Sequence, residues 1–167
     1  PAVVSAAAYH DIIHAVKNDD EAKVAALLKQ GVDVDTVTQE GDSLLMLAAK
    51  EGKPGVVKTI LASRPKLNAR NSYGETALMI AVFRGNTEDV KQLLDSGALI
   101  NHPGWTPLMY SAAGNRVEIA RLLISRGAQV NARAENGTSP LMMAAREGHL
   151  QMVLLLLENG ADVNYHT

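Results

Sequence analysis

The sequence contains no cysteine, and this absence excludes several kinds of site at once. Without thiols the chain has no disulfide framework, no zinc site with cysteine ligands and no thiol nucleophile. The sequence also has no large excess of positive or negative charge, because 16 Lys and Arg are balanced by 18 Asp and Glu, which gives a formal net charge of −2. Proteins that bind nucleic acids neutralise phosphates with a basic patch, so we expect no nucleic-acid partner.

Long apolar runs and aromatic residues are scarce too. No run approaches the roughly 18 residues of a membrane helix, so we expect no membrane partner. Aromatic residues make up only 4% of the 167 residues, although hydrophobic residues make up 47%, a proportion typical of globular domains. The core must therefore be built from aliphatic side chains.

What the sequence has instead is an internal repeat. Four segments share the pattern Gly-x-Ser/Thr-x-Leu-Met, with the hydroxyl residue at Ser43, Thr76, Thr106 and Ser139. Two of the intervals between these positions are 33 residues long and the middle one is 30. A fifth, degenerate copy lies upstream, and its register places His10 where the other copies have Ser or Thr. Such a period is the signature of a repeat architecture.

Each copy carries start and stop signals for two short helices. The Ser or Thr is a helix N-cap, and Pro107 and Pro140 follow it at the first helical position, where proline is favoured. A glycine such as Gly52 then ends the first helix in the left-handed conformation, and Asn115 and Asp19 replace this glycine in two copies. A second apolar helix follows. One such unit cannot bury its apolar face alone, so we expect the copies to stack.

These features resemble the ankyrin repeat family over residues 9 to 165, in period, caps, pairs of small residues and Gly-Ala-Asp-Val-Asn endings. The resemblance implies an all-α ankyrin-repeat solenoid of stacked helix-turn-helix units with β-turn fingers, which binds proteins and has no catalytic activity. We expect an N-terminal segment, 1–8, and a single ankyrin-repeat domain, 9–167. Its repeats are expected at about 9–37, 38–70, 71–100, 101–133 and 134–167. The array also resembles small bacterial ankyrin repeat proteins.

The N-terminal segment 1–8 allows two interpretations. Its small residues resemble the end of a secretory signal at its cleavage site, which would make the protein periplasmic or secreted. Alternatively, its alanines begin the first helix of a cytoplasmic protein.

Two departures from the family pattern lead to further expectations. Methionine stands where the family has histidine in four copies: Met46, Met79, Met109 and Met142. We interpret this row as core packing by an adaptable apolar side chain rather than as a soft-metal site. The 30-residue interval from Thr76 to Thr106 predicts one shortened finger.

The few rings gather on one expected face. The family geometry places finger tips and inner helices on a concave side, and five rings fall there: Tyr9, Tyr73, Phe83, Trp105 and Tyr110. Rings gathered on one face are typical of a binding surface. With their charged neighbours they predict a partner-binding set of Tyr73, Glu75, Phe83, Arg84, Trp105, Tyr110, Arg146 and Glu147. Two alternatives stay open: Tyr110 is half-buried in the stack, and Trp105 covers the shortened finger.

The sequence therefore predicts a non-catalytic module whose concave face binds another protein or peptide, without cofactor or metal. An alternative is an assembly role, in which the apolar C-terminal repeat of an otherwise monomeric chain pairs two copies or docks another domain. An enzyme or metal protein would depend on His10 and His14, which stand at i and i+4 without an evident third ligand. No hydrolase motif or phosphate-binding glycine loop occurs.

Overall fold

The structure, a computed structural model, describes residues 5–164, and helices dominate that range. The only β-type pairing in the described residues is an isolated bridge between Val37 and Ser43. This confirms the predicted all-α class. The chain divides into two compact units, residues 1–81 with 88–98 and residues 82–87 with 99–167, so the division passes through the fifth and sixth helices.

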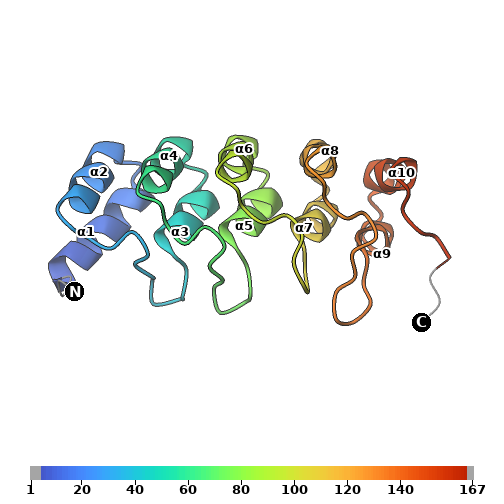
Figure 1. The fold of residues 1–167 in the computed structure, drawn as a ribbon, viewed down its shortest axis with the longest axis horizontal. Helices are drawn as coiled ribbons and strands as arrows, with labels where there is room; N and C mark the ends of the chain where they lie inside the picture. Colours follow the sequence, from blue (N-terminus) through green and yellow to red (C-terminus); the bar gives the residue numbers. More distant parts are fainter. Residues whose placement is uncertain (1–4, 165–167) are drawn as a thin grey trace. The chain divides into compact units, whose positions relative to one another are not determined.

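The first unit is built from antiparallel helix pairs that stack on one another (Figure 1). Its helices are α1 (Ala6–Lys17), α2 (Glu21–Lys29), α3 (Leu44–Glu51), α4 (Pro54–Ala62) and most of α5 (Ala77–Arg84) and α6 (Thr87–Asp95). Within pairs, α1 packs on α2 and α3 on α4; between pairs, α1 packs on α3 and α2 on α4. The core is aliphatic, as predicted, with Ile12, Leu45 and Ile60 fully buried.

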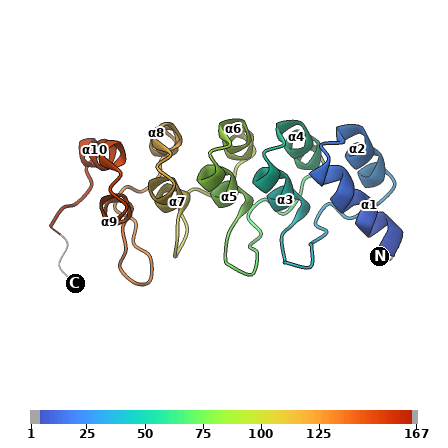
Figure 2. The same ribbon diagram turned by 180° about the vertical axis from the view of Figure 1, so that it is seen from behind.

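The second unit repeats this arrangement, as the view from behind also shows (Figure 2). Its helices are α7 (Pro107–Ala113), α8 (Val117–Ser125), α9 (Pro140–Arg146) and α10 (Leu150–Glu158). Here α7 packs on α8 and α9, and α10 packs on α9 and α8. The loop between α6 and α7 is visibly shorter than the loop between α8 and α9 (Figure 1), which confirms the shortened finger.

The helix ends follow the local sequence. The Oγ of Ser43 accepts the N–H of Met46 at 3.2 Å, and Thr106 and Ser139 cap α7 and α9 in the same way. The substitutes for glycine are left-handed as predicted, with φ of 60° at Asp19 and 53° at Asn115.

Three of the four methionines fill the core as predicted, whereas the prediction is wrong for Met142, which is 36% exposed. Met46, Met79 and Met109 are buried, and the sulfur atoms of Met46 and Met79 each accept the N–H of their own N-cap residue at 3.4 Å. Each N-cap side chain in turn accepts the methionine N–H, so the two residues satisfy each other. Methionine therefore keeps a hydrogen-bonding role at this position, which its apolar character did not indicate.

The first repeat departs from the predicted register. Its helix α1 begins at Ala6, and the Oγ of Ser5 accepts the N–H of Ala8 at 3.1 Å. His10 therefore lies inside the helix, and its predicted N-cap position is wrong. The physical reason is that alanine is the strongest helix former, so Ala6–Ala8 extend the helix to the nearest capping serine. The export interpretation falls partly on residues 1–4, which lie outside the described residues.

Candidate functional site

Three rings of the second unit contact one another edge to face. The centroids of Phe83 and Tyr110 lie 6.3 Å apart at an interplanar angle of 90°, and those of Trp105 and Tyr110 lie 5.7 Å apart at 70°. Such pairs contribute about 0.5–1.5 kcal/mol beyond the area they bury. Tyr110 is the shared partner, so we call Phe83, Trp105 and Tyr110 the aromatic cluster.

Helix ends place these rings. Phe83 lies in the last turn of α5, Tyr110 lies in the first turns of α7, and Trp105 directly precedes the N-cap of α7. The backbone carbonyl of Phe83 accepts a hydrogen bond at 3.0 Å from the Nε of Arg116. A Cβ at Gly85, whose φ is +77°, would lie 2.9 Å from the Arg116 guanidinium carbon, so glycine leaves room for this arginine.

The aromatic cluster is partly open to solvent. Phe83 is 48% exposed and Trp105 is 38% exposed, whereas Tyr110 is half-buried. Tyr110 therefore matches the alternative interpretation of a ring held within the stack, while Phe83 and Trp105 present apolar surface. Large exposed apolar groups that lie together are typical of an interaction site.

The predicted charged residues of the second unit lie at the ends of two helices, α5 and α9. Arg84 is exposed at the end of α5. Arg146 and Glu147, at the end of α9, form an ion pair with 3.1 Å between Nε and Oε1. Exposed pairs of this kind contribute roughly 0–1 kcal/mol, so this pair shapes the charge of the surface more than its stability.

The remaining predicted residues, Tyr73 and Glu75, belong to a finger of the first unit. The Oδ1 of Asn71 accepts the N–H of Tyr73 and the N–H of Glu75, both at 3.0 Å, and this closes the turn. The Nδ2 of Asn71 donates to the Glu75 carboxylate at 3.0 Å. Tyr73 is 83% exposed at the tip. The finger is thus internally fixed, and its ring stands in solvent.

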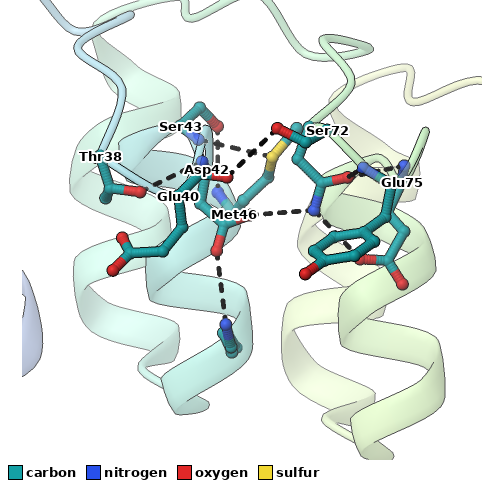
Figure 3. A network of polar contacts seen from close by, with 10 residues as sticks. Thr38, Glu40, Asp42, Ser43, Met46, Ser72 and Glu75 are labelled. Carbon is teal, nitrogen blue, oxygen red and sulfur yellow. Dashed lines mark hydrogen bonds and ion pairs between the residues drawn. The ribbon is translucent and has the colours of Figure 1, made fainter.

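Sequence reasoning missed the residue that links this finger to the preceding one. Asp42 is buried, and it accepts hydrogen bonds from the Nδ2 of Asn71 at 2.9 Å and from the Nζ of Lys50 at 3.4 Å (Figure 3). The hydroxyl of Ser72 reaches the carbonyl oxygen of Glu40 at 3.4 Å across the same two fingers. We call Asp42, Lys50 and Asn71 the polar network. The hydrogen bonds from Asn71 and Ser72 join neighbouring fingers and therefore depend on stacking, whereas Lys50 contacts Asp42 within one repeat.

A groove of about 340 Å³ lies beside the polar network in the first unit. Its lining includes Tyr9, His10, Lys17, Glu40, Asp42 and Lys50. The pKa of Glu40 is lowered first by a hydrogen bond from its own backbone and then by Thr38, so this carboxylate stays charged. The groove is therefore lined by charges of both signs, and Tyr9 meets His10 edge to face at 5.5 Å.

A second buried carboxylate of the first unit, that of Asp89, takes no part in the exposed candidate site. Asp89 is 1% exposed, and neither of its oxygens has a hydrogen-bond partner. Burial, and secondarily the charge of Glu88, raises the pKa of Asp89 to about 6. Aligned repeats could have revealed it, because apolar residues hold the same position elsewhere: Val56, Ile119 and Met152.

The described residues show no cluster for metal chemistry. No group of three or more His, Asp or Glu side chains in residues 5–164 is arranged to hold a metal ion, and the His14 ring lies 2.8 Å from the Asn18 amide nitrogen. Across the same residues, each helix is too short or too polar to cross a bilayer.

Comparison with known proteins gives consistent matches. A family model described as ankyrin repeats (3 copies) matches residues 12–103 and 99–167. The B-cell lymphoma 3 protein homolog of Mus musculus is 33% identical over 124 residues, which cover 70% of this chain and 28% of that protein. The Ankyrin repeat and KH domain-containing protein mask of Drosophila melanogaster is 47% identical over 60 residues, which cover 34% of this chain and 2% of that protein.

A third relative carries an enzyme name. The L-asparaginase of Dirofilaria immitis is 29% identical over 129 residues, which cover 75% of this chain and 22% of that protein. The chain thus spans between 2% and 28% of the length of these three relatives. All three are animal proteins, so the resemblance to small bacterial proteins stays a prediction.

Proposed function

Because the chain belongs to the ankyrin repeat family, we propose that it is a non-catalytic module that binds a partner protein or peptide through the aromatic cluster. Ankyrin repeats are generally protein–protein interaction modules and are typically non-catalytic. The observation that carries the proposal is the exposure of Phe83 and Trp105 around the half-buried Tyr110. Tryptophan and tyrosine are enriched among the residues that dominate binding energies.

The local structure supports binding by prepositioned anchors. The edge-to-face contacts and the hydrogen bond from Arg116 to the Phe83 carbonyl hold the rings before a partner arrives. Side chains that are already ordered lose less conformational entropy on binding, which leaves more of the contact energy as affinity. The rings would contact apolar groups of the partner.

The charged residues of the predicted set favour a partner whose surface carries both apolar groups and charges. Arg84, Arg146 and Glu147 would form the polar rim around the rings of the second unit, on the side that the family geometry makes concave. In the first unit, Tyr73 and Glu75 would supply a second contact from their fixed finger. A partner that presents apolar groups flanked by charges of both signs fits this combination.

Affinity capture from cells of the source organism tests the proposal. We expect the wild-type chain to retain a partner that Phe83→Ala and Trp105→Ala both lose. Val37→Ala is the matched control, because Val37 is exposed in a first-unit finger and makes no part of the aromatic cluster. Thermal unfolding of each variant reports whether the fold survives. Capture that persists in both ring variants would contradict the proposal.

A further inference from the structure

Helix α10 is apolar on two opposite faces. Its core face is fully buried and consists of Met152, Leu155 and Leu156. On the other side Leu150, Leu154 and Leu157 follow one another at i, i+4 and i+7, and they are 65%, 44% and 40% exposed. At 100° per residue these leucines form one stripe, opposite the core face. We call Leu150, Leu154 and Leu157 the leucine stripe.

Three of the four other repeats carry a basic residue where the leucine stripe has its centre, and the first repeat carries Ala25 there. The basic residues at the position of Leu154 are Lys58, Lys91 and Arg121, and all three are exposed. Solvent therefore covers this position in the earlier repeats, and a basic side chain suits it. A helix that is hydrophobic all round is normally buried. The leucine stripe is thus expected to be covered by another apolar surface.

The electrostatic character of the two ends of α10 favours an antiparallel copy of the same helix as the surface that covers the leucine stripe. The N-cap residue His149 makes no side-chain capping bond, and the first turn contains no acidic residue. The last turn contains Glu158 and no basic residue. A carboxylate is unfavourable at the C-terminus of its own helix and favourable at the N-terminus of another. An antiparallel copy of α10 would place each Glu158 beside the uncapped N-terminus of its counterpart.

We propose that two copies of this chain associate through the leucine stripe, with their α10 helices antiparallel about a two-fold axis at Leu154. Leu154 of each copy then meets its counterpart, and Leu157 of each copy packs between Leu150 and Leu154 of the other. A two-fold interface requires a self-complementary patch. The stripe and the charged ends of α10 meet that requirement together, because the same pairing covers the leucines and places both carboxylates.

The length of the seam limits its strength. A helix of nine residues is about 13 Å long, so the contact buries less than the roughly 1,200 Å² at which standard-size interfaces begin. We therefore expect a weak dimer with a dissociation constant on the order of 100 µM. The surface differs from the aromatic cluster, so the two proposals fail separately: Phe83→Ala should leave dimerisation unchanged.

Sedimentation equilibrium of the full chain tests this pairing. Between roughly 10 µM and 1 mM, concentrations that bracket the expected dissociation constant, the mass should rise from 17.8 kDa toward twice that value. Leu154→Lys should remain monomeric throughout, and it should fold normally because three repeats carry Lys or Arg at this position. Val37→Lys, which changes another exposed aliphatic residue, should dimerise like the wild type.

A charge-swap experiment tests the register. Leu154→Lys and Leu154→Glu should each be monomeric, because like charges would meet across the two-fold axis. An equimolar mixture of the two should associate again, because opposite charges would then meet. Three results would each overturn the proposal: a wild-type monomer at about 1 mM, well above the expected dissociation constant; a Leu154→Lys dimer; or a mixture that stays monomeric although circular dichroism shows both variants folded.

Discussion

The two units use the same two repeat positions for different chemistry. The residue directly before a helix N-cap is Asp42 in the first unit, before Ser43, and Trp105 in the second unit, before Thr106. Seven residues after the N-cap stands Lys50 in the first unit and Phe83 in the second. The first pair forms a hydrogen bond within the polar network, whereas the second pair contributes the exposed rings of the aromatic cluster. A repeat backbone thus fixes where side chains stand, and their chemistry decides what the position does.

The comparison also separates stability from binding. Asp42 is buried, so it acts mainly within the molecule by joining two fingers. Phe83 and Trp105 leave much of their surface in water, where only a partner could cover it. We therefore expect substitutions in the polar network to change the free energy of unfolding, and substitutions in the aromatic cluster to change partner affinity.

The largest effect is expected when the second unit receives the side chains of the first. The double variant Phe83→Lys and Trp105→Asp replaces both exposed rings by charges. Two binding anchors of about 2 kcal/mol each correspond to a roughly thousandfold loss of affinity for a captured partner. Titration calorimetry with that partner would measure the loss, and unchanged affinity would remove the distinction between the two units.

A similarly large effect on stability is expected at Asp89, the unpartnered carboxylate of the first unit. Its pKa of about 6 in the folded chain lies above the ordinary value of 3.8, so folding favours the protonated form. Stability should therefore fall as the pH rises from below 3.8 to above 6, by about 3 kcal/mol in total for this group. Urea unfolding at pH 5 and at pH 7.5 should show roughly half of that loss, about 1.4 kcal/mol, because the carboxyl of the unfolded chain is already mostly ionised at pH 5.

Two variants isolate the contribution of Asp89 to this pH dependence. Asp89→Val should be more stable than the wild type at neutral pH and should lose this part of the pH dependence. Asp89→Asn should lose the pH dependence as well, but it should gain less stability because its amide stays polar and buried. A wild-type pH profile that both variants reproduce would show that Asp89 is not the responsible group.

A smaller effect is expected from breaking the polar network. Asp42→Ala removes the acceptor for the Asn71 amide and the Lys50 amine, so the free energy of unfolding should fall by about 1–3 kcal/mol. Asp42→Asn retains an acceptor oxygen and should cost less. Chemical denaturation measures both variants. Equal losses would mean that the carboxylate charge, rather than the hydrogen bond to Asn71, supplies the stabilisation.

The smallest effect is expected from the exposed finger ring. Tyr73→Ala should change the free energy of unfolding by less than about 0.5 kcal/mol, because the ring is almost fully in solvent. Asn71→Ala in the same turn should cost more, because two backbone N–H groups lose their acceptor. Thermal melts of the two variants would compare them directly. A larger loss for Tyr73→Ala would show that the ring has a structural contact.

The fold was predictable from the sequence because its signals are local and recur. Caps at Ser43 and Thr106 and left-handed stops at Asp19 and Asn115 depend on a few neighbouring residues, and the structure confirms them. The error at His10 has the same origin. Ala6–Ala8 are strong helix formers and the Oγ of Ser5 caps them, so local helix propensity rather than repeat register decides where α1 begins.

The candidate site was predictable only in part. The repeat register indicated which residues share a face, but the ring contacts of Tyr110 and the link from Asn71 to Asp42 join different repeats. Contacts of this kind depend on rotamers and on the spacing between stacked units, which a linear pattern does not contain. The unpaired state of Asp89 likewise follows from its surroundings in the core.

The central claim is that the aromatic cluster contacts the partner, and the single tryptophan allows a direct measurement. Incorporation of 5-fluorotryptophan gives the chain one ¹⁹F resonance, which reports on Trp105 alone. We predict that this resonance shifts when a captured partner is added to saturation, and that Phe83→Ala weakens the titration. A partner that saturates the chain while the Trp105 resonance stays unchanged would contradict the claim.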